Sequence, residues 1–161
     1  MKYVCVFCII LFTATPVCTQ SVSGVLASDE TWSGTVSLLG DITVPEGITL
    51  NILPGTRIEC EPRIDIEVSG EETSMIEFIV DGGTLNAEGT EAEPIVFTSG
   101  SSSPERSHWY GIRINTDSAV LKYCTIEYGT TGVAFEGGAA RKWNIAPFGR
   151  TNSMVFLWET M

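Results

Sequence analysis

The chain has one histidine, His108, and several serines precede it, so we first consider acid–base and nucleophilic chemistry. A histidine can act as a general base near neutral pH. The serines at 101–103 and Ser107 lack the spacing of a strained nucleophile turn, which argues against a hydrolase triad. A lone histidine and the lack of a Cys-x-x-Cys pair in residues 21–140 also argue against a zinc site. We therefore expect His108 to end a surface loop.

Carboxylates are the second group with chemical potential. Within residues 57–68 acidic side chains alternate at Glu59, Glu61, Asp65 and Glu67. In a strand, residues two apart share a face, so with Arg63 nearby these acids could imitate the site of a polysaccharide lyase. The simpler interpretation is a solvated acidic face, with the apolar side chains pointing inward at Ile58, Ile64, Ile66 and Val68.

Aromatic side chains offer a third possibility, the binding of sugars by stacking. The candidates lie in adjoining strand-like segments, at Trp109, Tyr110, Tyr123 and Tyr128. A groove along stacked strands would suit a linear polymer. The competing interpretation is that these aromatic residues pack into the core or cover it.

Two of the five cysteines, Cys60 and Cys124, belong to the body of the chain. In an oxidising compartment they could form a disulfide. Nothing in the sequence brings them close together, so we favour two buried thiols, each a small apolar residue in its own part of the core.

The first 20 residues are typical of a signal peptide. Lys2 supplies a positive charge, and Val4–Phe12 is apolar but too short to span a bilayer. We expect cleavage between Cys18 and Ser21, secretion to the extracellular space or cell surface, and no membrane span in the mature chain. Lipidation of Cys18 is the alternative, although Pro16 and Val17 fit a lipobox poorly.

Residues 21–140 carry nineteen acidic and five basic side chains, a net charge of −14. Such a surface repels phosphate backbones and anionic membranes, which excludes nucleic acid as a partner. It would attract calcium outside the cell, so Ca²⁺ is the one cofactor that we consider. The simpler interpretation is a soluble, solvated coat and no cofactor.

Short strand-like runs bounded by Gly, Pro, Asp or Ser recur after the signal, which predicts an all-β fold. A related phrase occurs twice, in residues 41–58 and 79–99, and each copy contains Thr-Leu-Asn followed by Gly-Thr. Such repetition favours stacked copies of one unit over a sandwich or barrel. We expect turns at Gly47, Gly55, Gly83 and Gly89. Ile64–Val68 resembles a strand, but residues 61–74 are also compatible with an inserted loop.

The chain resembles secreted bacterial proteins built on the right-handed parallel β-helix, the pectate-lyase-like architecture. The matching phrases cover most of residues 32–138 and are Thr31–Val36, Ile42–Ile58, Gly83–Thr90, Glu93–Ser99, Trp109–Ile114 and Leu121–Gly129. The resemblance implies a short solenoid of coils over residues 21–140. It implies no particular activity, because this architecture carries many functions, and no family catalytic residue transfers to this sequence.

The strand-turn rhythm stops in residues 141–161, where the net charge is +2 and Trp143 and Trp158 appear. This tail is either a cap over the last coil or the product of a shifted or clipped reading frame. We expect a non-catalytic extracellular scaffold for adhesion, surface display or contact with polysaccharide. The alternative is the N-terminal part of a polysaccharide lyase or glycoside hydrolase whose active site lies on further coils.

Overall fold

The protein is an all-β solenoid in the computed structural model, which describes residues 19–136, 145–148 and 153–156. Its strands run mostly parallel to one another and stack in register. In chain order they are β1 (Thr19–Val25), β2 (Glu30–Trp32), β3 (Thr35–Pro45), β4 (Thr49–Ile52), β5 (Arg57–Cys60), β6 (Glu77–Asp81), β7 (Thr84–Glu88), β8 (Ile95–Ser99), β9 (Trp109–Asn115), β10 (Ala119–Lys122), β11 (Cys124–Ile126), β12 (Gly129–Phe135), β13 (Ile145–Phe148) and β14 (Ser153–Phe156).

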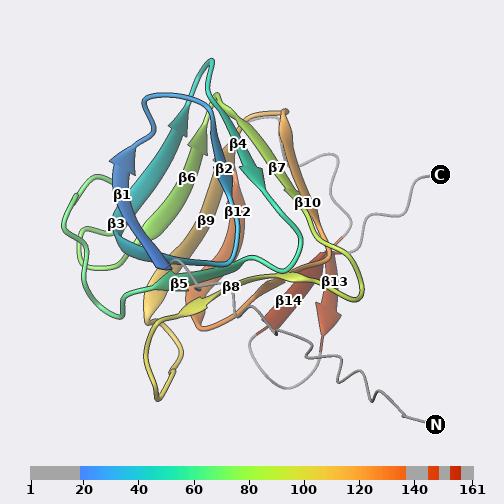
Figure 1. The fold of residues 1–161 in the computed structure, drawn as a ribbon. Helices are drawn as coiled ribbons and strands as arrows, with labels where there is room; N and C mark the ends of the chain where they lie inside the picture. The colour runs from blue at the N-terminus through green and yellow to red at the C-terminus, as the bar shows by residue number, and fades with distance from the viewer. Residues whose placement is uncertain (1–18, 137–144, 149–152, 157–161) are drawn as a thin grey trace, which may run out of the picture.

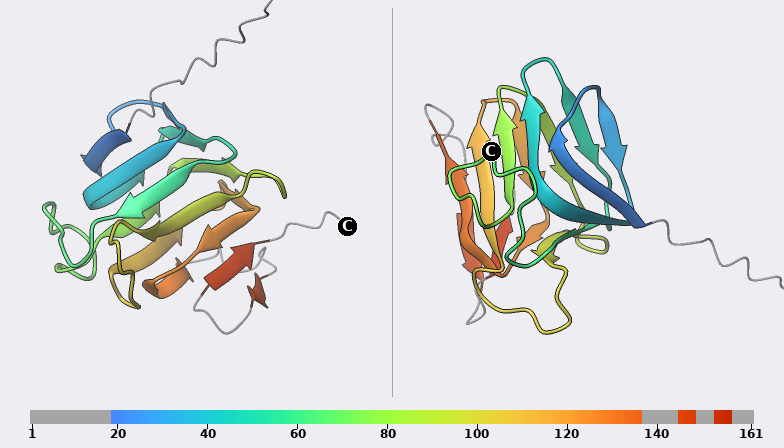
Figure 2. Two further views of the ribbon diagram at one scale, coloured as in Figure 1. Left: turned by 60° about the horizontal axis from the view of Figure 1, so that its bottom comes forward. Right: turned by 90° about the vertical axis from the view of Figure 1, so that its left-hand side faces the viewer.

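The strands form three faces around one core (Figure 1). Face 1 is the sheet β2-β4-β7-β10. Face 2 contains the first part of β1, the first part of β3, β5, β8 and β11. Face 3 contains the rest of β1, the rest of β3, β6, β9 and β12. Each turn around the three faces is one coil, and the coils stack along the axis (Figure 2). The predicted parallel β-helix is confirmed.

The repeated Thr-Leu-Asn phrase forms equivalent strands of successive coils. Strands β4 and β7 pair so that Thr49 lies beside Thr84 and Asn51 beside Asn86. The Asn86 amide donates to the Asn51 side-chain oxygen at 2.9 Å, a ladder contact between like residues. The turn before β7 needs Gly83, because a Cβ there would lie 2.6 Å from the carbonyl oxygen of Pro45.

The core is a column of inward-pointing side chains from all three faces. Fully buried aliphatic residues stack on their equivalents in the next coil, as Val36 does on Ile58 of β5. Three aromatic rings cross the centre: Phe78 meets Trp32 and Phe97 edge-on, with ring centroids 6.1 and 5.5 Å apart. These rings come from faces 3, 1 and 2, so they tie the three sheets to one another.

The strand predicted at Ile64–Val68 is wrong. Residues 61–76 form a loop inside one coil, between β5 and β6, and they project beside face 3 (Figure 1). The side chains expected to point inward, Ile64, Ile66 and Val68, are about half exposed, at 49%, 60% and 55%. The alternating pattern is real, but this segment has no neighbouring strand with which to form a ladder.

The two ends of the chain lie largely outside the described residues, including most of the predicted signal peptide and both tail tryptophans. Strand β14 pairs antiparallel with β11 and with β13, so the last described strands extend face 2 beyond β11. Within the described part of the chain, no helix is long and apolar enough to cross a membrane.

Candidate functional site

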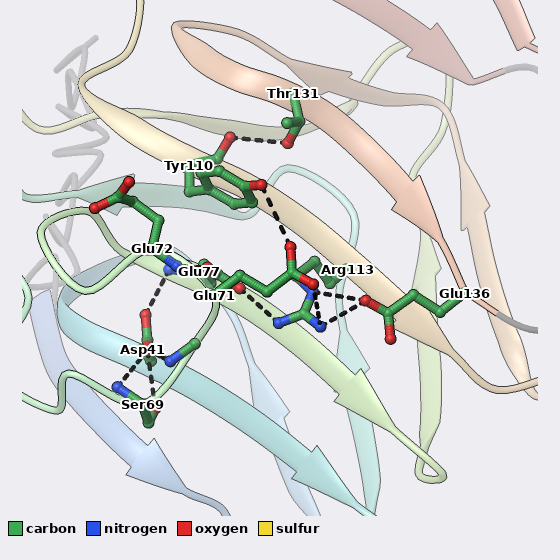
Figure 3. A network of polar contacts seen from close by, with 10 residues as sticks. Asp41, Ser69, Glu71, Glu72, Glu77, Tyr110, Arg113, Thr131 and Glu136 are labelled. Atoms are coloured by element: carbon green, nitrogen blue, oxygen red, sulfur yellow. Dashed lines mark hydrogen bonds and ion pairs between the residues drawn. The ribbon is translucent and has the colours of Figure 1, made fainter.

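The outer surface of face 3 carries a cluster of ion pairs centred on Arg113 (Figure 3). Arg113 points outward from β9 and lies directly beside Ile79 of β6. Its guanidinium contacts Glu77 at 2.9 Å and Glu71 at 3.4 Å, and Nε donates to Glu136 at 2.9 Å. The carboxylates come from β6, the 61–76 loop and the end of β12, so three segments meet at one cation.

Burial makes this cluster stronger than an ordinary surface ion pair. The Arg113 side chain is 15% exposed, and that of Glu77 is fully buried. Burial alone would lower the pKa of Arg113, but the hydrogen bonds that it donates to Glu136 and Glu77 raise the pKa overall. Partial burial and the charge of Glu71 also raise the pKa of Tyr110, whose hydroxyl lies 3.5 Å from that carboxylate. Arg113 is thus a fixed cation and cannot serve as a proton acceptor.

A buried carboxylate, Asp41, anchors the 61–76 loop beside this cluster (Figure 3). Asp41 Oδ2 accepts from the Ser69 backbone N–H at 3.0 Å, the Ser69 hydroxyl at 2.8 Å and the Gly70 N–H at 2.6 Å. Asp41 Oδ1 accepts from the Glu77 N–H at 2.7 Å. Asp41 lies where β3 bends from face 2 to face 3, so one side chain fixes both the corner and the loop.

The anchored loop borders a hollow of about 400 Å³ on face 3. Its floor is formed by outward side chains of successive coils, and Ser69 contributes from the loop. The lining residues are Val25, Thr43, Ser69, Ile79, Asp81, Arg113, Asn115 and Glu136. Most of these residues follow the axis of the solenoid, so the hollow is a groove across several coils; we call it the face 3 groove.

The stacked coils agree with the protein family that the sequence matches. Residues 24–141 match the family model of the pectate-lyase-like β-helix domain. The chain belongs to this family. No curated protein and no solved structure matches the chain significantly. The matched range runs from the end of β1 to beyond β12 and so includes every strand from β2 to β12.

His108 ends the 100–108 loop directly before β9, as predicted, but its side chain is buried, with 6% of its surface exposed. Its Nδ1 lies 2.8 Å from the Ser99 hydroxyl, and Ser99 occupies the core position below Cys60. Glu105 Oε2 lies 3.9 Å from Nε2. The three side chains resemble a hydrolase triad in composition, but the Ser99 hydroxyl is enclosed and offers no nucleophile to a substrate.

The aromatic residues predicted to stack on sugar do not form a common platform. Trp109 is fully buried, and its Nε1–H donates to the Glu127 carbonyl at 2.8 Å, so it belongs to the core. Tyr110 faces outward from β9 near Glu71. Tyr123 and Tyr128 lie at two corners of the last described coil, each with a positive φ. The sugar-stacking prediction is wrong for Trp109, because a buried ring has no face to offer.

The acids within residues 57–68 do not converge on a lyase-like site. Glu59 pairs with Arg57 at 2.7 Å on β5, whereas Asp65 and Glu67 belong to the loop. Asp65 Oδ1 accepts from the Asp41 N–H at 3.1 Å, a structural contact. Among the described residues, no group of three or more His, Cys, Asp or Glu side chains is arranged to hold a metal ion.

Both body cysteines are free and buried, so the disulfide considered from sequence is absent. Cys60 ends β5 and Cys124 begins β11, two strands away across β8. Two strand spacings exceed the roughly 7 Å that a disulfide can bridge. Burial raises the pKa of both thiols, that of Cys124 to about 12.

Sequence reasoning missed Arg113, Asp41 and Glu77 as members of one site. Asp41, Glu77 and Arg113 follow one another at intervals of 36 residues, which is close to the length of one coil with its turns. The three lie on adjacent strands of face 3, but in the ladder of β6 and β9 Glu77 lies beside Gly111, whereas Arg113 lies beside Ile79. The pairing of Glu77 with Arg113 is therefore a diagonal contact between neighbouring strands, which the repeat alone does not predict.

We expect Asp41→Ala to release the 61–76 loop. The substitution removes the acceptor of four hydrogen bonds, each contributing about 0.5–1.5 kcal/mol, so the open form of the loop should rise at least tenfold. Trypsin cleaves after the exposed Arg63 in this loop, and its initial rate should rise by about the same factor.

The matched control is Asp81→Ala, which removes another acid from face 3, one that accepts from the Asn115 amide at 2.9 Å and, among the described residues, makes no hydrogen bond to the loop. It should leave cleavage at Arg63 unchanged. Cleavage at Lys122, the last residue of β10, reports on global unfolding and should stay slow in both variants. Equal rates at Arg63 for the Asp41 and Asp81 variants would show that Asp41 does not hold the loop.

Proposed function

We propose that this β-helix is a non-catalytic extracellular scaffold, which presents face 3 to polysaccharide or other cell-surface material. The observation that carries the proposal is the internal pairing of its reactive groups. Arg113 is held by three carboxylates, Asp41 by four donors, and His108 lies buried against Ser99. Lyase or hydrolase chemistry needs a base or a pair of acids that can reach the substrate.

The architecture supports a role in display. The coils contribute strands to all three faces, and each inner strand is bonded to the coils on both sides, which gives a rigid surface. The loops at 61–76 and 100–108 project from the corners without interrupting the ladders. A scaffold of this kind varies its loops and outward side chains while the core stays constant.

A turnover assay tests the non-catalytic part. The purified chain is incubated with neutral and acidic polysaccharides, with calcium and with chelator, while reducing ends and unsaturated products are measured. We expect no product above that of buffer in any arm. Product formation that Glu136→Gln or Arg113→Met abolishes would overturn the proposal and favour the enzyme alternative.

Secretion is tested separately, by expressing residues 1–161 in a bacterial host. We expect the protein outside the cytoplasm, with a new N-terminus between Cys18 and Ser21. Protein that stays in the cytoplasm with Met1 intact would contradict the extracellular assignment. A lipid attached to Cys18 would instead place the scaffold at the membrane surface.

A further inference from the structure

The face 3 groove runs along the solenoid axis, and its floor consists of two parallel columns of outward side chains. In the first column Val25, Thr43, Ile79 and Arg113 lie side by side on β1, β3, β6 and β9. Three strand spacings separate the ends of this column, roughly 14 Å. The groove is thus long enough for an extended ligand lying across several coils.

The second column sets the hydrogen-bonding character of the groove. Asp81 and Asn115 are neighbours on β6 and β9, and Glu136 follows β12 at the same edge. The side-chain N–H of Asn115 donates to Asp81 at 2.9 Å, so the side-chain oxygen of Asn115 points away from Asp81. The groups left for a ligand are therefore mainly acceptors: carboxylate oxygens, an amide oxygen and the hydroxyl of Thr43.

The charge of the groove selects against anions. The lining of the groove contains two acids, Asp81 and Glu136, and one guanidinium, that of Arg113. Two further acids, Glu71 and the buried Glu77, lie next to this guanidinium. Since Arg113 is already paired with three of these carboxylates, it offers no free cation to a ligand carboxylate. A polyuronate would meet uncompensated negative charge here.

A peptide strand fits this groove poorly. The groove lies on the face of a sheet, where the backbone N–H and C=O groups are already paired with the adjacent coils. Addition of a strand needs an open sheet edge. A ligand here must be recognised by side chains alone, through donors aimed at the acceptor column and apolar surface against Val25 and Ile79.

We propose that the face 3 groove binds a linear glycan that carries hydroxyl donors and no carboxylates. The hydroxyl groups donate to Asp81, Asn115 and Thr43, while C–H faces of the sugar rings cover Ile79. This inference deepens the proposed function by naming the ligand class of the same face. A protein that acts on acidic polysaccharide would prefer the opposite class of ligand, a glycan with carboxylates.

The test is calorimetric titration of the intact protein with neutral hexasaccharides of glucose, xylose, mannose and galactose, and with hexagalacturonate. We expect at least one neutral hexasaccharide to bind and hexagalacturonate to bind at least tenfold more weakly, with and without calcium. Ile79→Arg, which fills the middle of the groove, should weaken neutral binding at least tenfold. Asn115→Ala should weaken it severalfold.

The matched control is Val120→Arg, because Val120 is also a β-branched, half-buried outward residue of a strand, but on face 1. It should leave binding unchanged, and circular dichroism should show each variant folded. The inference is overturned if no neutral hexasaccharide binds, if hexagalacturonate binds as tightly, or if the Ile79 and Val120 variants behave alike. A neutral glycan that binds and is cleaved would instead overturn only the non-catalytic proposal.

Discussion

Phe78→Ala is expected to lower the free energy of unfolding by about 3–5 kcal/mol, the range for removing a buried aromatic side chain. Phe78 is fully buried on β6, and a cavity the size of its ring would remain among residues that cannot collapse into it. A loss of this size is a large part of the total stability of a small domain.

The position of Phe78 makes the loss larger than burial alone would suggest. Its ring meets Trp32 of β2 at an interplanar angle of 85° and Phe97 of β8 at 82°. These contacts join three faces and three successive coils through one side chain. In a solenoid each coil is stabilised by its neighbours, so removing this ring weakens two coil interfaces at once.

Urea unfolding followed by tryptophan fluorescence measures the effect on the chain. The control is Ile79→Ala, the next residue of the same strand, which is half-buried and points outward. Its replacement should cost less than about 1.5 kcal/mol. If the two variants unfold at the same urea concentration, the aromatic cluster does not hold the three faces together.

The coils were predictable because the signals for them are local. Each strand is a short β-branched run, and several turns use a glycine with a positive φ, as Gly55 does with a φ of 76°. The Thr-Leu-Asn phrases at Thr49 and Thr84 then stack in register. Short-range chemistry and the repeat period are thus sufficient to define this part of the fold.

The 61–76 loop was harder to predict because its contacts are distant in sequence. Ile64, Ile66 and Val68 alternate as they would in a strand, but a strand also requires a partner ladder, which no local pattern reveals. What fixes the loop is Asp41, bonded to Ser69 and Gly70 some 28 residues later. A carboxylate that caps a remote loop has no signature of its own in the sequence.

The burial of His108 was missed for a related reason. The segment that precedes it is rich in Ser, Pro and Glu, which is typical of an exposed loop. The loop turns back into the core at His108, which meets Ser99. On the two preceding coils the position equivalent to Ser99 is apolar, occupied by Leu38 and Cys60. A polar residue in an apolar ladder needs an internal partner, and His108 supplies it.

Arg113→Met is expected to lower the free energy of unfolding by about 3 kcal/mol. The substitution keeps most of the apolar stem of the side chain but leaves Glu77 Oε2 without its partner at 2.9 Å. Because the Glu77 side chain is fully buried, its charge would remain without a cation and without water. Breaking a buried ion pair by removing one partner typically costs about 3–5 kcal/mol.

The control for Arg113 is Arg57→Met, which breaks the pair with Glu59 at 2.7 Å on face 2. The Arg57 side chain is 46% exposed, so its loss should cost less than about 1 kcal/mol. Adding Glu77→Gln to Arg113→Met should recover at least about 1 kcal/mol, since the amide needs no cation and can still accept from the Glu72 N–H. Chemical unfolding of the four proteins separates these effects. Equal losses for Arg57→Met and Arg113→Met would mean that burial does not strengthen the Arg113 cluster.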